Sequence, residues 1–258
     1  MKALIIRAPG INRDRDAALA CELAGATPER HHINQIAAGS INLADYGLLI
    51  IPGGFSYGDH LGAGKLLAVD LIHRLGEPLS RFVADGRPVI GICNGFQVLV
   101  KAGLLPGWTH RSDPAVTLTD NHSRRFECRW VTLEPDPGCV CPFIRDLARP
   151  IEVPVAHGEG RIAVAADADL NDLHGRGLIA LRYQGAPGTP AAYPANPNGS
   201  RGDIAAICNP QGNVLGLMPH PENAVLPQQH PRWTREPWRE EGDGLALFRN
   251  AVRYAAAL

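Results

Sequence analysis

The chain has 258 residues, of which 45% are hydrophobic and 20% are charged, and its formal net charge is -1 at pH 7. This length and composition are typical of a globular protein that buries a core without disulfide bonds. The balanced charge excludes a global field that would attract nucleic acid or an anionic membrane. No apolar run has the length of a signal-peptide core or a membrane span, which predicts a cytoplasmic protein.

The first 103 residues alternate between strand-like and helix-like patterns. Residues 2–9, 46–54 and 87–93 are short apolar runs that predict buried strands, and residues 12–26, 61–84 and 94–103 have helical patterns. Such alternation predicts an α/β fold, in which a doubly wound, mostly parallel sheet with a flavodoxin-like core carries helices on both faces. In this architecture reactive groups gather beyond the carboxyl ends of the strands.

From about residue 125 the pattern becomes β-rich. Pro, Gly and Asn turns separate short predicted strands, and the Pro- and Gly-rich residues 184–202 predict an irregular loop. Residues 242–258 predict a C-terminal helix with an apolar stripe. Because nothing marks a boundary, residues 1–258 are predicted to form one domain. The strands of this half are predicted at 125–133, 151–158, 161–164, 177–184, 203–210 and 213–220, the last two joined as a hairpin.

The cysteines other than Cys93 do not indicate a metal site. Cys139 and Cys141 are most simply two reduced thiols near the surface, because no second cysteine pair or histidine pair completes four zinc ligands. A chain of this size also has no need of disulfide bonds. We therefore predict no metal.

Cys93 lies where a predicted strand meets a predicted helix, in the segment Gly91-Ile92-Cys93-Asn94-Gly95. Gly-x-Cys-x-Gly at such a junction is typical of a nucleophile elbow, a sharp turn that raises the nucleophile above the sheet. The unpaired N–H groups of the following helix favour a thiolate, and the Asn94 N–H can point at an oxyanion. A small buried residue in a tight turn is the alternative.

His220 and Glu222 supply a candidate base and its orienting carboxylate. They lie in Pro-His-Pro-Glu, where each proline restricts the residue before it to extended backbone. Residues i and i+2 of an extended chain point to the same side, so Glu222 can orient the imidazole as the third member of a triad does. The alternative is a surface turn with an incidental histidine.

The Gly-rich residues 51–65 follow another predicted strand and expose backbone N–H groups. They can supply the second oxyanion donor. A phosphate-binding loop is excluded there, because Asp59 and Leu66 stand where that motif needs glycine and Ser or Thr. The chain has no nucleotide-binding motif.

Together, "IPGGFSYGD" (51–59), "GICNGF" (91–96), "VPVAHGEGR" (153–161) and "PHPE" (219–222) resemble the class I, or triad, glutamine amidotransferases. The resemblance implies that Cys93 attacks the carboxamide of L-glutamine and forms a thioester, while His220 and Glu222 complete the triad. It also implies an oxyanion hole made by the N–H groups of Gly54 and Asn94.

The resemblance further implies that Gln97 is a candidate contact to glutamine, and that His157, Glu159 and Arg161 are candidate contacts to a partner. That partner would be a synthetase subunit that consumes ammonia with ATP and Mg²⁺, so no cofactor is expected in this chain. A further small subunit stays open, as does the role of residues 223–241, which are longer than in the shortest relatives.

Three alternatives remain at this point: a cysteine hydrolase or peptidase on a similar fold, another class I amidotransferase, and a binding subunit that has lost catalysis.

Overall fold

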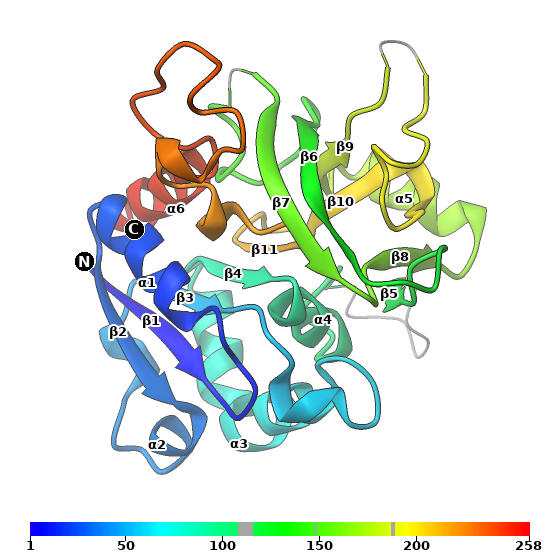
Figure 1. Cartoon of the computed structure of the whole chain (residues 1–258). Coiled ribbons are helices and arrows are strands. Elements are labelled where there is room, and N and C mark those ends of the chain that lie inside the picture. Colours follow the sequence, from blue (N-terminus) through cyan, green and yellow to red (C-terminus); the bar gives the residue numbers. More distant parts are fainter. Residues whose placement is uncertain (108–115, 148, 187–188) are drawn as a thin grey trace.

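The structure of the chain is a computed structural model that describes residues 1–107, 116–147, 149–186 and 189–258. Both chain ends lie on the same side of the molecule (Figure 1). The α-helices are α1 (Asp14–Leu23), α2 (Ile33–Ala37), α3 (Lys65–Ala84), α4 (Asn94–Lys101), α5 (Asp167–Gly175) and α6 (Leu245–Ala256). The strands are β1 (Lys2–Arg7), β2 (Thr27–His32), β3 (Leu48–Ile51), β4 (Val89–Ile92), β5 (Val116–Thr119), β6 (Glu127–Pro135), β7 (Ile151–His157), β8 (Arg161–Val164), β9 (Ile179–Tyr183), β10 (Ile204–Cys208) and β11 (Val214–Leu217).

The larger sheet has the strand order β2-β1-β3-β4-β11-β10-β9-β6-β7. Neighbours from β2 to β11 are parallel, whereas every pair from β11 to β7 is antiparallel. The order of the parallel strands is flavodoxin-like, so the predicted doubly wound α/β fold with a β-rich second half is confirmed. Strands β5 and β8 pair with each other in a separate antiparallel sheet.

The helices form two layers on the parallel strands. Helix α1 packs against α6, and α3 packs against α4, on opposite sides of the sheet (Figure 1). Strands β1, β3 and β4 therefore have both faces covered, which explains why their sequences are continuous apolar runs. None of the helices in the described residues has the length and apolar character that a membrane-spanning helix requires.

Strands β2 and β5 and helices α2 and α5 were not predicted, and helix α3 begins later than predicted. Strand β2 has the polar sequence TPERHH and pairs only with β1, at the edge of the sheet, where partial exposure tolerates polar residues. Helix α3 begins at Lys65 rather than near residue 61, because Gly62 and Gly64 adopt positive φ angles.

The turn between β4 and α4 packs its backbone directly against β3. A Cβ atom built on Gly95 would lie 1.9 Å from the carbonyl oxygen of Ile51, and one on Gly91 would lie 2.6 Å from the carbonyl oxygen of Gly95. Only glycine fits at these two positions without moving the backbone. The sequence pattern around Cys93 is therefore a packing requirement of the sheet.

We expect Gly95→Ala to lower the free energy of unfolding by about 1–3 kcal/mol, because the new methyl group overpacks a site filled by backbone atoms. Gly76→Ala is the matched control: Gly76 lies inside α3 with open space around it, and the change should raise stability by about 0.5–1 kcal/mol. Urea unfolding of both variants measures the difference. Equal stability of the two variants would contradict the close packing at Gly95.

Candidate active site

Cys93 occupies the turn between β4 and α4 with φ 51° and ψ -105°, in the left-handed region that favours glycine. Its N–H donates to the carbonyl oxygen of Leu217, at the end of β11, over 2.8 Å. Its Sγ lies 3.7 Å from the carbonyl oxygen of Ala156 on β7. The ends of two other strands thus surround a thiol that is held in a strained backbone conformation.

His220 and Glu222 lie just beyond the carboxyl end of β11, and both are buried. Nδ1 of the His220 ring is 2.6 Å from Oε1 of Glu222. The backbone N–H of His220 donates to the carbonyl oxygen of Pro154 over 2.8 Å. These contacts fix the ring so that Nε2 stays free of any hydrogen bond to a described residue. The predicted contact between the imidazole and its i+2 carboxylate is present, but residues Pro221–Asn223 form a short 3₁₀ helix instead of the extended backbone that the prolines predicted.

Gly53 shows that Cys93 and His220 converge. A Cβ atom on Gly53 would lie 2.9 Å from Cε1 of His220 and 3.5 Å from Cβ of Cys93. The thiol and the imidazole therefore border the same small glycine, although Cys93 and His220 lie 127 positions apart in the sequence. Any larger residue at position 53 would push between them.

Charge on the neighbouring groups controls the protonation of His220. Burial by itself lowers the pKa of this imidazole, but the negative charges of Glu222 and Cys93 outweigh burial and raise the pKa well above its ordinary value. The raised pKa favours a thiolate–imidazolium pair, in which the sulfur is the stronger nucleophile.

Two backbone N–H groups, those of Asn94 and Gly54, have no hydrogen-bond partner among the residues that the structure describes. Asn94 begins α4, so its N–H lacks a partner inside the helix. Gly54 lies opposite Ile11 in an isolated β-bridge. The hydrogen bonds of this bridge run from the Phe55 N–H to Gly10 and from the Asn12 N–H to Gly53, so the Gly54 N–H forms no bond to any described residue. Such donors can hold an oxyanion.

The side chains of Asn94 and Gln97 connect the elbow to two loops. Asn94 Oδ1 accepts from the Ser56 N–H over 3.1 Å, and Asn94 Nδ2 donates to Gln97 Oε1 over 3.0 Å. Gln97 Nε2 in turn donates to the carbonyl oxygen of Glu159 over 2.6 Å. Both ends of the Gln97 carboxamide are thus bonded within the chain, and its contact to glutamine stays a prediction.

Comparison with known proteins identifies the family of this site. Residues 1–255 match the model of the CobB/CobQ-like glutamine amidotransferase domain. The chain belongs to this glutamine amidotransferase family. It is 52% identical to the phosphoribosylformylglycinamidine synthase subunit PurQ of Treponema denticola, over 87% of this chain and 88% of that protein. It is 46% identical to the subunit of the same name from Dehalococcoides mccartyi, over 99% and 98%.

A solved structure agrees with these relatives. The structure of PurLQS from Thermotoga maritima contains a chain that is 32% identical, with a TM-score of 0.72 and coverage of 98% of both chains. The predicted resemblance to class I glutamine amidotransferases is therefore confirmed for the family and the fold.

The three candidate partner contacts of this amidotransferase differ in exposure. Glu159 and Arg161 are partly exposed, and the Arg161 side chain donates to the carbonyl oxygen of Asp120 over 3.1 Å. His157, in contrast, is buried, so its side chain is not presented to a partner at the surface. Buried His157 therefore requires a different interpretation.

Sequence analysis missed Asn121, which organises the turn after β7. Its Nδ2 donates to the carbonyl oxygens of His157 over 2.7 Å and Arg125 over 2.9 Å, and its Oδ1 accepts from the Gly160 N–H over 3.0 Å. No local pattern marks this asparagine, because two of its three side-chain partners, His157 and Gly160, lie in a distant segment of the chain.

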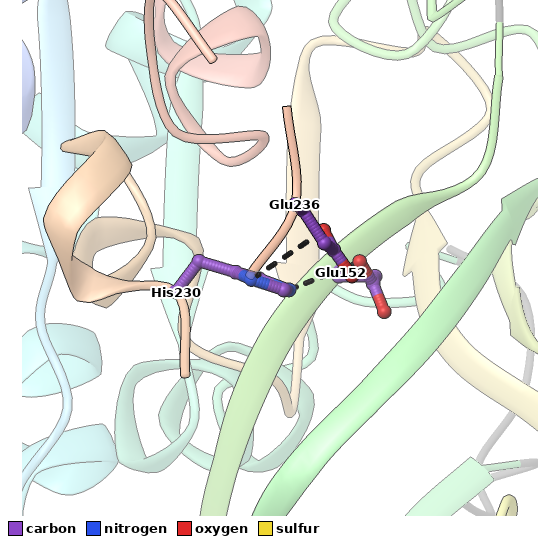
Figure 2. A group of neighbouring side chains, drawn as sticks. All are labelled: Glu152, His230 and Glu236. Carbon is purple, nitrogen blue, oxygen red and sulfur yellow. Dashed lines mark hydrogen bonds and ion pairs between the residues drawn. The ribbon is translucent and has the colours of Figure 1, made fainter. Parts of the chain in front are cut away.

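One cluster has the composition of a metal site. Ligand atoms of Glu152, His230 and Glu236 lie within 4.8 Å of one another, and Figure 2 shows the His230 ring directed toward both carboxylates. However, Arg232 and Arg239 each bond to both carboxylates, so their charges are already neutralised by guanidinium groups. We interpret the cluster as an ion-pair network that fastens residues 223–241 to β7.

The thiols of the second half are closer to the core than predicted. Cys141 and Cys208 are fully buried, and Cys139 is half-buried with its Sγ 3.7 Å from that of Cys208. The contact with Cys208 and burial raise the pKa of the Cys139 thiol. The prediction of reduced thiols agrees with these free cysteines, whereas the surface location holds only in part.

The ion-pair network predicts a pH-dependent contribution to stability. Hydrogen bonds from Arg232 and Arg239 lower the pKa of Glu236 from 4.5 to about 2. A carboxylate whose pKa is lower in the folded state stabilises the fold at any pH above its pKa in the unfolded state. This stabilisation is lost as the pH falls toward the pKa of the folded state. Glu236→Gln should therefore destabilise the protein at neutral pH, and the deficit should shrink as the pH falls to about 3.

Urea unfolding at the two pH values measures that deficit. Glu240→Gln, at an exposed carboxylate for which the structure describes no ion pair, is the control. A deficit in Glu236→Gln that is the same at both pH values would show that the charge of Glu236 does not stabilise this segment.

Proposed function

We propose that this chain is the glutaminase subunit of phosphoribosylformylglycinamidine synthase, which hydrolyses L-glutamine to glutamate and ammonia. The observation that carries the proposal is the convergence of Cys93 with the His220–Glu222 pair at the carboxyl ends of β4 and β11. The names of the relatives from Treponema denticola and Dehalococcoides mccartyi support the pathway.

The reaction proceeds through two tetrahedral intermediates. The Cys93 thiolate attacks the carboxamide carbon, and protonated His220 gives its proton to the departing nitrogen, which leaves as ammonia. A γ-glutamyl thioester remains on Cys93. His220, now neutral, takes a proton from water, whose oxygen attacks the thioester carbon and releases glutamate and the thiolate.

The oxyanion of each intermediate is held by the N–H groups of Gly54 and Asn94. Both groups belong to backbone that close packing holds in place, because a Cβ on Gly54 would lie 2.6 Å from the carbonyl oxygen of Gly10. Preorganised donors of this kind need little rearrangement during the reaction. Glu222 keeps the His220 ring in place and stabilises its positive charge.

The ammonia passes to a synthetase subunit, which uses ATP and Mg²⁺ to convert formylglycinamide ribonucleotide to formylglycinamidine ribonucleotide in purine biosynthesis. This chain itself needs no cofactor. The name of the Thermotoga maritima structure, PurLQS, supports an assembly with a synthetase subunit. We also propose a cytoplasmic location. Residues 1–258 are proposed to form one amidotransferase domain, since the nine-stranded sheet contains strands from both halves of the chain.

Contacts to the synthetase subunit form beside the active site. Glu159 and Arg161 are the candidates, since both are partly exposed and Glu159 bonds through its backbone to Gln97 near the elbow. Phe126 is 54% exposed and lies beside Gly158. These positions would let the partner influence the site through the turn after β7.

We expect Cys93→Ala to abolish synthesis that depends on glutamine and to spare synthesis from added ammonium salt, because only the first reaction needs the thioester. The assay follows formylglycinamidine ribonucleotide in the complex with both nitrogen sources. Cys128→Ala, at an exposed thiol on β6, is the control and should retain both activities. Equal loss of both activities in Cys93→Ala would mean that Cys93 supports assembly.

We expect Glu222→Gln to lower kcat for glutamine hydrolysis about 100-fold and to change KM much less. The amide retains the shape of the carboxylate but removes the charge that raises the pKa of His220. Steady-state kinetics of glutamate release in the complex measure both constants. A wild-type kcat would remove Glu222 from the triad.

The same assay separates the alternative functions. Glutamate release that is specific for glutamine and rises with the synthetase subunit supports the proposal. A cysteine hydrolase or peptidase on this fold would act on other substrates and show no response to the partner, and a binding subunit would release no glutamate.

A further inference from the structure

His157 is a buried imidazole whose protonation the structure defines. Nδ1 lies 3.1 Å from Oδ1 of Asn121. The other contacts of Asn121 fix which end of its amide faces His157, because Nδ2 faces two carbonyl oxygens and Oδ1 faces the Gly160 N–H. The amide oxygen can only accept, so Nδ1 of His157 carries the proton and donates it.

The second ring nitrogen of His157 is left with a lone pair and no partner. Nε2 is buried and forms no hydrogen bond with any described residue. Burial and the positive charge of His220 lower the pKa of His157 to about 4, so the ring stays neutral at physiological pH. A buried acceptor without a donor is costly, which makes such an atom a candidate for ligand binding.

His157 lies next to the reacting groups. It follows Ala156, whose carbonyl oxygen is 3.7 Å from Sγ of Cys93, and it is close enough to His220 for the charge of that ring to affect its protonation. The ring is held in place, because a Cβ on Gly160 would lie 2.5 Å from Nδ1. His157 is thus a fixed, neutral acceptor at the edge of the catalytic site.

We propose that Nε2 of His157 accepts a hydrogen bond from the carboxamide NH₂ of bound glutamine and so makes the site select an amide over an ester or a carboxylate. This inference rests on the proposed glutaminase function. The carboxamide is the only part of glutamine that presents a neutral N–H donor, whereas the product glutamate presents an acceptor there. An acceptor facing the product carboxylate is repelled, so the same contact favours release of glutamate.

Two substitutions of His157 separate the ring nitrogens. His157→Asn places an amide near the position of Nδ1 and preserves the contact to Asn121, but it removes the acceptor at Nε2. His157→Gln reaches the position of Nε2 and preserves the acceptor, but it loses the contact to Asn121. If His157 is only structural, its contact to Asn121 matters, and His157→Asn keeps that contact. If His157 binds the substrate as proposed, the acceptor at the position of Nε2 matters, and His157→Gln keeps that acceptor.

The experiment compares L-glutamine with L-glutamate γ-methyl ester, which presents no leaving N–H and releases methanol instead of ammonia. Glutamate formation is measured with the full chain in complex with the synthetase subunit, ATP and formylglycinamide ribonucleotide. In His157→Asn we expect kcat/KM for glutamine to fall about 10- to 100-fold, while kcat/KM for the ester changes little. In His157→Gln the amide-to-ester ratio should stay near that of the wild type.

Equal losses for both substrates in His157→Asn, or a lower amide-to-ester ratio in His157→Gln than in His157→Asn, would overturn the inference. If His157→Asn does not fold, the ratio in His157→Gln decides: a wild-type ratio supports the acceptor, and a collapsed ratio overturns it. A wild-type complex that hydrolyses neither substrate would overturn the proposed function, and this inference with it.

Discussion

The backbone turn at Cys93 is the constraint on which the rest of the site depends. A positive φ at a residue with a side chain costs about 1–3 kcal/mol and persists only where the surroundings enforce it. Here the contact of Gly95 with the Ile51 carbonyl and the hydrogen bond from Cys93 to Leu217 enforce it. The same turn places Sγ of Cys93 3.7 Å from the carbonyl oxygen of Ala156 on β7, and it puts the Asn94 N–H at the start of α4, where it has no partner inside the helix. The packing of β4 against β3 and the position of the buried Cys93 thiol are therefore set by one structural feature.

Two buried histidines beside this turn differ because their partners differ. His220 faces the Glu222 carboxylate, whose negative charge raises the pKa of the imidazole and prepares it to carry a proton. His157 faces the Asn121 amide, which supplies no charge, so burial dominates and the ring stays neutral. The first ring can carry and transfer a proton, whereas the second stays neutral, donates through Nδ1 to Asn121 and keeps an acceptor at Nε2. The partner atom, rather than the residue type, decides the chemistry of each ring.

Strand β7 links these features. It carries Ala156 and His157 at its carboxyl end, and its Pro154 carbonyl oxygen accepts from the His220 N–H. Near its other end Glu152 joins the arginines and His230 of residues 223–241 (Figure 2). These residues follow Glu222 directly in the chain. Ion pairs therefore hold the segment that follows the triad against the strand that borders the thiol.

The sequence by itself determined the features that local patterns encode. Apolar runs predicted β1, β3 and β4, and glycine spacing predicted the elbow at Cys93. The i, i+2 spacing predicted the His220–Glu222 pair, although Glu222 lies in a 3₁₀ helix and not in extended chain. Only the tertiary structure decided the polar edge strand β2, the burial of His157 and the role of Asn121. The physical reason is that these features depend on partners distant in sequence: β2 needs the edge of β1, and Asn121 lies 36 residues before His157. The spacing of apolar residues predicts which face of a helix or strand is buried, but it does not predict which other element covers that face.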